Sequence, residues 1–399
     1  MTTIAWLIPR LISGSGGHRT ILLYANALQR AGYRCVLYVE DDDSRENLAD
    51  VIRKMFGFDF SSVRHGWSNI DPADLVFATI WYSANVVRDL SFPCIKCYLV
   101  QDYEALFNPV GDAYLMAENS YRYGLYPITI GRWLKHKLYV DFGVPAYHID
   151  FCADTTIYHK QPMRRERSIC FIYQPEKPRR CSQIGIEALG IATYLDPDVK
   201  VYLYGSNEKP KLWYKNEHCG LISRTECNIL YNKCSVGLCL SSSNPSRVPF
   251  EMMASGLPVV ELWRENNLYD MPHQAVSLCE QTPESLAYEL LRILDDEHEI
   301  SRRSEAGISF MKNRTEDFET TRFLEIIKEL LNGSRSEAND VSILYDGPRA
   351  ISINPVIHTT PRSGIHKHFI SNNIVYSFPR FMRPLVRFAG RRIKKLISN

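Results

Sequence analysis

Residues 4–31 read IAWLIPRLISGSGGHRTILLYANALQRA, and this stretch decides the fold expected for the first half of the chain. The apolar run at 4–9 is typical of a buried strand, and residues 20–31 carry leucines and alanines at helical spacing before Gly32. Between them, Gly14, Gly16 and Gly17 form a short loop. A strand, a glycine loop and a helix in this order predict the first unit of a parallel α/β sheet.

The glycine loop has two interpretations. Its backbone amides and the start of the following helix are suited to an anion such as a diphosphate, with Gly16 and Gly17 as binding residues. A tight turn between strand and helix explains the same glycines. His18 either bonds a substrate or caps its own helix. Arg19 stands where a dinucleotide-binding fingerprint requires glycine, which argues against an NAD-dependent dehydrogenase.

The alternation of strands and helices continues along the chain. The first unit adds strands at 35–40, 75–79, 95–101 and 127–130 and a helix at 132–141. The second unit is expected to contain strands at 168–173, 199–204, 236–240 and 258–261, with helices at 182–195, 225–232, 250–255, 283–296 and 316–332. These patterns predict an α/β protein with two Rossmann-like domains, 1–157 and 158–332, facing across a cleft, and an extension at 333–399.

Composition narrows the class of protein. Lys plus Arg is 47 and Asp plus Glu is 45, a balance that argues against nucleic-acid binding as the main task. The eleven cysteines follow no repeating framework, and Arg10 interrupts the apolar start where a signal peptide would continue. No window has the length and apolarity of a membrane-spanning helix. We therefore expect a cytoplasmic protein whose membrane contact, if any, is peripheral.

Three cations follow the predicted strand at 168–173. Lys177, Arg179 and Arg180 precede a helix, so they can project toward the phosphates of a ligand in the cleft. A solvated basic loop is the alternative for each of them. Further along, Pro249 marks a helix start that places Glu251 in the first turn, where a carboxylate can accept hydrogen bonds from sugar hydroxyls. Pairing with the helix dipole is the structural alternative for Glu251.

These parts resemble, in order, the retaining nucleotide-sugar glycosyltransferases of family 4, which have the GT-B fold. The resemblance covers roughly the first 300 residues and rests on the glycine loop and on segments 129–134, 142–145, 153–158 and 220–223. The stretch 250–258, FEMMASGLP, is the closest match. Two departures are clear: the first of the family's paired glutamates falls on Ser243, and the arginine for the diphosphate falls on Pro175.

The resemblance implies a retaining transfer in which the leaving diphosphate accepts the proton of the incoming hydroxyl. The enzyme then has to supply positive charge and amide donors around the diphosphate. The residues that match the family's donor site are Gly16, Gly17, Lys177, Arg179, Arg180, Leu221, Arg247, Phe250 and Glu251. Leu221 falls in the segment that surrounds the nucleobase. The transfer is expected to need no metal and no cofactor beyond the sugar-nucleotide donor.

The segment 101–104, QDYE, resembles a branch of bacterial rhamnosyltransferases that use dTDP-L-rhamnose to build surface glycans. Asp102 is therefore predicted to act with Arg180 and Glu251 in catalysis by orienting an acceptor hydroxyl, whereas capping of a strand-end loop is the alternative. The implied partners are this donor and a glycan or lipid-linked glycan acceptor. A UDP- or GDP-sugar transferase and a catalytically silent sugar-nucleotide- or glycan-binding protein are the rival hypotheses.

The terminal stretch is basic and amphipathic. Between Arg380 and Lys395 there are seven basic residues and no acid, and apolar residues at 385–397 recur at helical spacing. Such a segment, about 380–397, is suited to an anionic membrane surface. A helix packed back on the protein explains the pattern equally well.

Overall fold

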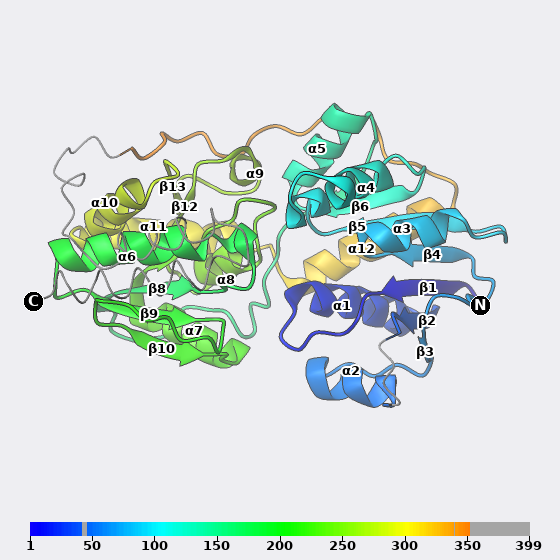
Figure 1. The fold of residues 1–399 in the computed structure, drawn as a ribbon, viewed down its shortest axis with the longest axis horizontal. Helices are drawn as coiled ribbons and strands as arrows, with labels where there is room; N and C mark the ends of the chain where they lie inside the picture. Colours follow the sequence, from blue (N-terminus) through cyan, green and yellow to red (C-terminus); the bar gives the residue numbers. More distant parts are fainter. Residues whose placement is uncertain (42–45, 339, 352–399) are drawn as a thin grey trace, which may run out of the picture.

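The computed structural model describes residues 1–41, 46–338 and 340–351. It contains two parallel sheets, each within its own α/β domain (Figure 1). The first sheet has the order β3-β2-β1-β4-β5-β6-β7, and the second has the order β10-β9-β8-β11-β12-β13. Both orders reverse direction at a switch point beside the first strand, as in doubly wound nucleotide-binding folds. The predicted fold class, two Rossmann-like domains, is confirmed.

In the described residues, the sheet of the N-terminal domain has seven strands. They are β1 (Thr3–Ile8), β2 (Arg34–Val39), β3 (Val63–His65), β4 (Leu75–Ala78), β5 (Ile95–Val100), β6 (Tyr126–Ile130) and β7 (Tyr147–Ile149). The helical elements between them are α1 (Gly16–Arg30), α2 (Leu48–Phe56), α3 (Trp81–Arg88), η1 (Glu104–Phe107), α4 (Asp112–Ser120) and α5 (Arg132–Phe142). The central strand β1 is apolar because residues 4–8 are buried between helices on both faces of the sheet.

The C-terminal domain repeats this plan. Its strands are β8 (Glu166–Ile172), β9 (Lys200–Tyr204), β10 (Glu217–Gly220), β11 (Cys234–Leu238), β12 (Val259–Leu262) and β13 (Val276–Cys279). Its helical elements are η2 (Pro178–Arg180), α6 (Ser182–Leu195), α7 (Arg224–Lys233), α8 (Val248–Ala254), α9 (Glu265–Leu268), α10 (Pro283–Leu294) and α11 (Glu297–Met311). The 3₁₀ turn η2 and helix α8 follow the ends of β8 and β11, which flank the switch point of this sheet.

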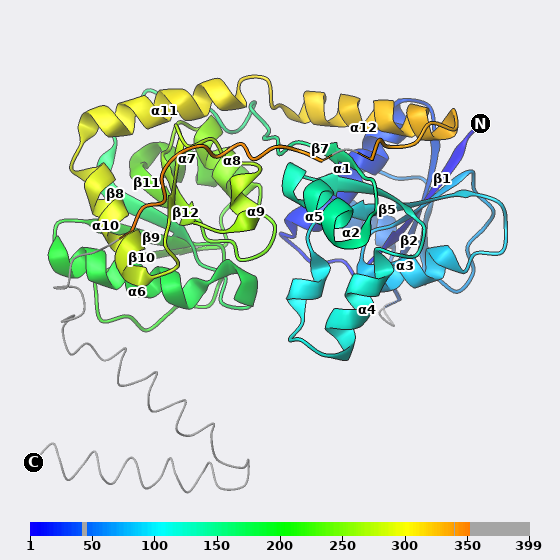
Figure 2. The same ribbon diagram turned by 90° about the horizontal axis from the view of Figure 1, so that it is seen from above.

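The last helix among the described residues, α12 (Glu316–Leu331), returns to the N-terminal domain (Figure 2). The ring of its Phe323 stacks on Tyr24 of α1 with centroids 4.3 Å apart and lies 6.0 Å from Trp6 of β1. The predicted C-terminal domain, 158–332, includes this helix, whereas its packing places it with the N-terminal domain. The apolar face of α12 is unambiguous in sequence, but nothing in that face indicates which domain it covers.

The described part of the extension runs back over both domains. Val341 packs against the core of the N-terminal domain, and Ala350 pairs with Cys279 at the end of β13. Residues 380–397, for which a membrane contact is predicted, lie outside the described residues. Among the residues that the structure describes, no helix is long and apolar enough to cross a bilayer.

Candidate functional site

The candidate site lies where the two domains meet. From the C-terminal domain, the segments after β8 and β11, residues 173–181 and 239–247, face the N-terminal domain. From the N-terminal domain, the glycine loop after β1 and the QDYE segment after β5 face them. Since ligands of parallel α/β sheets bind beyond the carboxyl ends of the strands, both domains present their ligand-binding edges to each other.

The glycine loop is built around the start of α1. Ser15 is the N-cap, and its hydroxyl accepts a hydrogen bond from the backbone amide of His18 at 3.4 Å. The His18 ring contacts the same hydroxyl at 2.9 Å and is buried, so this histidine belongs to the helix cap. Gly16 and Gly17 are the first two residues of α1, and the Gly17 carbonyl accepts a hydrogen bond from the Gln101 side chain at 3.2 Å.

The three predicted cations differ in their surroundings. Lys177 is partly exposed and pairs loosely with Glu176 at 3.9 Å. Burial lowers the pKa of Arg179, whose guanidinium lies 4.2 Å from the ring centroid of Phe107 in the opposite domain. Arg180 is buried and donates to the Ser241 hydroxyl at 2.5 Å. Arg179 therefore contacts the opposite domain, whereas Arg180 and Lys177 have partners within their own domain.

A carboxylate that the sequence did not single out lies behind Arg180. Glu261, at the end of β12, is fully buried and accepts hydrogen bonds at 2.8 Å from the backbone amides of Ser241 and Leu262. Burial raises its pKa to about 8, although Arg180 and the two amides oppose the shift. Its second oxygen, Oε2, has no hydrogen-bond partner. Glu261 supports the Ser241 segment against which Arg180 rests.

Asp102 contacts the C-terminal domain directly. Its Oδ1 accepts the backbone amide of Asn244 at 2.8 Å, and its Oδ2 accepts the Ser243 hydroxyl at 3.0 Å. Arg179 approaches the same Oδ2 at 3.5 Å. The residue is 7% exposed, so the carboxylate is engaged by the opposite domain. Oδ1 also accepts the backbone amide of Tyr103 at 2.9 Å, as the capping alternative expects, while the contact with an acceptor hydroxyl stays a prediction.

Asn244 extends this contact. Its side-chain amide donates at 2.9 Å to the carbonyls of both Gln101 and Ile130, at the ends of β5 and β6. Its own backbone carbonyl accepts from Arg180 at 3.4 Å. A chain of contacts thus runs from Gly17 through Gln101 and Asn244 to Arg180. The glycine loop, the QDYE segment and the cationic loop, which the sequence proposed separately, are brought together here.

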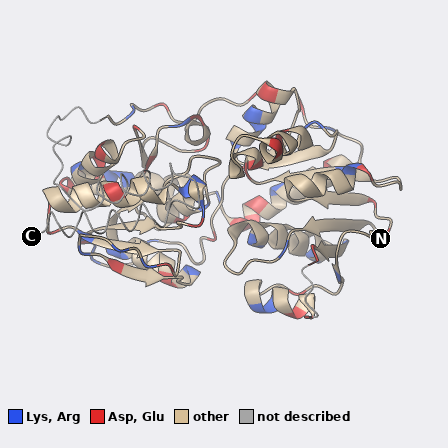
Figure 3. Ribbon diagram, viewed as in Figure 1, with Lys and Arg blue, Asp and Glu red and all other residues tan. Residues whose placement is uncertain are grey.

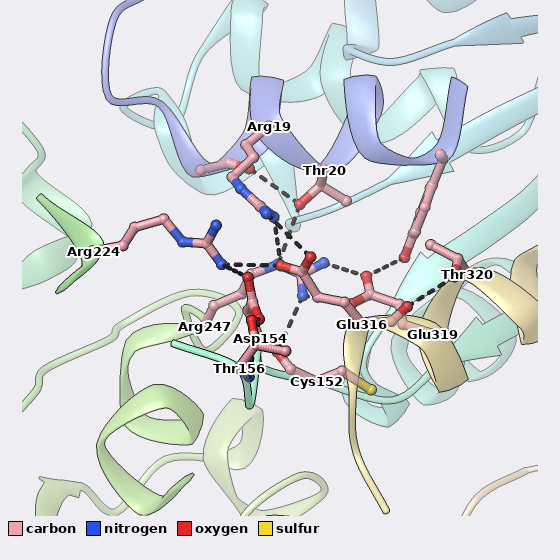
Figure 4. Close-up of polar contacts among 12 residues, drawn as sticks. Arg19, Thr20, Cys152, Asp154, Thr156, Arg224, Arg247, Glu316, Glu319 and Thr320 are labelled. Carbon is pink, nitrogen blue, oxygen red and sulfur yellow. Dashed lines mark hydrogen bonds and ion pairs between the residues drawn. The ribbon is translucent and has the colours of Figure 1, made fainter. Parts of the chain in front are cut away.

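Glu251 lies near Tyr158, Arg224 and Arg247, beside the linker between the domains. Burial raises its pKa, while Arg224, Arg247 and Tyr158 oppose the shift. Around it, a set of ion pairs joins the domains, which we call the linker-side cluster: Arg19, Asp154, Arg224, Arg247, Glu316 and Glu319 (Figure 4). Arg19 pairs with Glu316 at 2.7 Å, and Arg224 pairs with Asp154 at 2.8 Å.

Arg247 and Phe250 have partners within the protein. Arg247 pairs with the fully buried Glu319 of α12 and donates to the Cys152 carbonyl at 3.2 Å. Burial alone lowers the pKa of Arg247, but Glu319 outweighs it and holds this pKa above its ordinary value. The Phe250 amide donates to the Arg247 carbonyl at 3.0 Å. In this structure α12 and the helix turn itself engage this guanidinium and this amide, and their predicted contact with the diphosphate stays a prediction.

The remaining predicted residue, Leu221, is 62% exposed at the surface that follows β10. Its amide donates to the Asn207 side chain at 3.3 Å. Charge of both signs is distributed over both domains (Figure 3). Within the ranges 1–41, 46–338 and 340–351, no group of three or more His, Cys, Asp or Glu side chains has the arrangement of a metal site. Independence from metal stays a prediction.

The two facing Rossmann-like domains define the GT-B fold, and the chain matches solved glycosyltransferase structures of that fold. A family model described as "WsaF, C-terminal domain" matches residues 167–291. The O-antigen biosynthesis protein RfbC of Myxococcus xanthus is 28% identical over 346 residues, which is 83% of this chain and 27% of RfbC. The chain therefore spans about a quarter of the length of this relative.

Two solved structures share the fold of this chain at low sequence identity. A single-residue mutant of S. aureus TarM, in complex with fondaparinux, α-GlcNAc-glycerol and UDP, has a TM-score of 0.67 at 9% identity, covering 83% of this chain and 100% of TarM. A protein described as a UDP-N-acetylglucosamine 2-epimerase from Listeria monocytogenes has a TM-score of 0.56 at 11% identity, covering 86% and 99%. Proteins with these different descriptions share the fold, so the fold alone does not assign the reaction.

Proposed function

We propose that this chain is a glycosyltransferase that moves a sugar from a nucleoside diphosphate to a glycan acceptor in polysaccharide biosynthesis. The observation that supports this most is the meeting of the glycine loop, Arg179 and the QDYE segment at one domain interface, with Arg180 bonded to the Asn244 carbonyl beside them. In a transfer between two bound substrates, each domain contributes one ligand-binding edge to the reaction. The name of the M. xanthus relative supports the same class of pathway.

The chemistry follows from the groups at this interface. As the bond between the sugar and the diphosphate breaks, negative charge develops on the leaving phosphate. We propose that Arg179 and Arg180 stabilise it, because both guanidinium groups are partly or fully removed from water. Glu251 is proposed to accept hydrogen bonds from the ribose, as its match to the family's second glutamate implies. We propose that the leaving diphosphate accepts the proton of the incoming hydroxyl and that the sugar keeps its anomeric configuration.

The finer proposal is that the donor is dTDP-L-rhamnose. It rests on the QDYE segment, which resembles a branch of rhamnosyltransferases that use this donor. The acceptor is proposed to be a growing or lipid-linked surface glycan. The basic segment at 380–397 would then hold the enzyme at an anionic membrane surface.

The direct test is turnover. The protein is incubated with dTDP-L-rhamnose, UDP-glucose or UDP-N-acetylglucosamine, each with and without a rhamnosylated acceptor. We expect release of dTDP that depends on the acceptor, together with a product one rhamnose heavier by mass spectrometry. Acceptor-independent conversion of UDP-N-acetylglucosamine to its 2-epimer would instead support the epimerase reaction found on the same fold. Binding without any turnover would support a silent sugar-nucleotide-binding protein.

A second test addresses the donor site. Replacing Glu251 by Ala should remove most of the thermal stabilisation that dTDP gives, which is about 2.7 kcal/mol at 100 times the dissociation constant. Replacing the exposed Glu297 of α11 by Ala removes a carboxylate outside the predicted donor site, so it is the matched control and should leave this stabilisation unchanged. An unchanged shift in Glu251→Ala would remove this residue from the donor site.

A further inference from the structure

Two buried aspartates cross the domain interface in opposite directions. Asp102 of the N-terminal domain accepts the Asn244 amide of the C-terminal domain at 2.8 Å. Asp270 of the C-terminal domain accepts the amides of Arg132 and Trp133, at the start of α5, at 2.8 and 3.2 Å. Both are nearly inaccessible, with exposed fractions of 7% and 3%. The two contacts are chemically alike, since each is a carboxylate that binds backbone amides across the interface.

Their surroundings differ. The Asp270 contact ends on α5 and involves none of the residues predicted for the donor site. The Asp102 contact ends on segments 239–247 and 173–181, which carry residues predicted to bind the donor. Ser243 donates to Oδ2 at 3.0 Å, and Arg179 approaches the same oxygen at 3.5 Å. One carboxylate therefore holds a backbone amide, a hydroxyl and a guanidinium of the opposite domain. All three are groups that a phosphate or a sugar hydroxyl would also use.

The neighbouring contacts show that this segment depends on the N-terminal domain. The Asn244 side chain spans the interface to the carbonyls of Gln101 and Ile130. Arg180 in turn donates to the Asn244 carbonyl at 3.4 Å. Without Asp102, the Asn244 amide and the Ser243 hydroxyl would be buried without an acceptor, which is unfavourable for each group. The segment would then have to move to satisfy them.

We infer that Asp102 is a positioning residue: from the N-terminal domain it fixes Ser243, Asn244 and Arg179 of the C-terminal domain, so that the donor-side groups are ordered only while the domains are closed. This inference rests on the proposed transfer of a sugar from a nucleoside diphosphate. It replaces the expectation that Asp102 orients the acceptor. It also couples the parts of the site that the two domains contribute, because Asp102, which follows β5, determines where segment 239–247 lies.

The experiment compares Asp102→Ala and Asp102→Asn with Asp270→Asn in the full chain. In Asp102→Ala we expect kcat with dTDP-L-rhamnose and a rhamnosylated acceptor to fall about 100-fold, the loss typical of misplaced site groups. The dissociation constant for dTDP should stay within about threefold, because Glu251 and Arg180 remain.

Asp102→Asn keeps an oxygen for the Asn244 amide but loses the charge that faces Arg179, so its kcat should fall about tenfold. Asp270→Asn should keep kcat within about threefold, since it loosens the same interface away from the site.

A measurement that needs no turnover follows the contact itself. Hydrogen exchange of a peptide covering 241–247 should accelerate in Asp102→Ala and not in Asp270→Asn, because only the former frees the Asn244 amide. Melting temperatures of both variants show whether each remains folded. The full-length wild-type protein, with and without dTDP, provides the reference.

The outcomes separate the inference from the function on which it rests. A wild-type protein that turns over no sugar nucleotide contradicts the proposed function, and the positioning role fails with it. If the wild type is active, three results overturn the inference alone: unchanged kcat in Asp102→Ala, unchanged exchange at 241–247, or an equal loss of kcat in Asp270→Asn. A loss confined to dTDP affinity would likewise overturn it, since it would make Asp102 a ligand-binding residue.

Discussion

The two domains are joined by two contact regions that use charge differently. In the linker-side cluster, arginines meet carboxylates, and the deepest pair is Arg247 with the fully buried Glu319. In the strand-end contact, formed by Asp102, Arg179, Ser243 and Asn244, a single carboxylate is satisfied mainly by an amide and a hydroxyl. Breaking the first region leaves unpaired charges, whereas the second can exchange one hydrogen-bond acceptor for another. This difference indicates that the linker-side cluster holds the domains in a fixed arrangement, which we call the fixed joint, whereas the strand-end contact can rearrange.

The largest expected effect concerns the fixed joint. Glu319→Gln should lower the free energy of unfolding by about 3–5 kcal/mol, because it leaves the Arg247 guanidinium buried without its counter-charge. Tyr24 also donates to this carboxylate, at 2.6 Å. Urea denaturation followed by circular dichroism measures the change. Glu316→Gln, which affects a partly exposed pair on the same helix, is the control and should cost about 1 kcal/mol or less. Equal losses of unfolding free energy in the two variants would contradict the distinction between the buried Arg247–Glu319 pair and the partly exposed pairs around it.

A smaller effect is expected beside the strand-end contact. Glu104 is fully buried, and burial raises its pKa to about 8 from an ordinary value of 4.5, although Tyr98 and the Trp81 amide oppose the shift. The folded state therefore binds a proton that the unfolded state has released, and stability falls as the pH rises from about 4.5 to about 8.

Glu104→Gln removes this charge while keeping an oxygen for the two donors. It should flatten that part of the pH dependence and stabilise the protein above pH 8 by on the order of 2 kcal/mol. Urea titrations at several pH values test this. Glu261 has a raised pKa in the same range, so part of the slope should remain. A variant less stable than the wild type at high pH would show that the Glu104 charge is stabilising.

The smallest effect is a response to salt. The Arg19–Glu316 and Arg224–Asp154 pairs have side chains that are 15% to 33% exposed, so added salt should screen them and lower stability by about 1 kcal/mol or less. The Asp102 contact, dominated by an amide and a hydroxyl, should respond less. Denaturation of the wild type and of Glu316→Gln is measured at low and at high sodium chloride, without sodium sulfate. The change in stability between the two salt concentrations tests this. An undiminished salt response in the variant would place its origin outside the cluster.

Long apolar strands and amphipathic helices were predictable from the sequence because their burial dictates their pattern. The helix predicted at 182–195 coincides with α6, and the strand predicted at 199–204 differs from β9 by one residue. Short edge strands such as β3 and β10 were missed, since three or four residues with few buried side chains leave no period to recognise.

Helix α11 was missed for a different reason. Its sequence is charged and carries Gly307 in its interior, which argues against a helix in isolation. In the fold, the missing side chain lets α11 approach α8 closely: a Cβ at Gly307 would lie 3.2 Å from atoms of Met253. Tertiary packing therefore favours a residue that the local propensity disfavours.

By itself, the sequence determined the two α/β domains, the glycine loop, the cationic loop and the position of Glu251 in a helix start, because each depends on residues close together in the chain. Only the tertiary structure decided which of these groups are free. Arg247 is paired with a helix 72 residues away, and Asp102 is bound by residues 141 and 142 positions later. Such contacts leave no local pattern, since they arise from the way two separately folded sheets face each other.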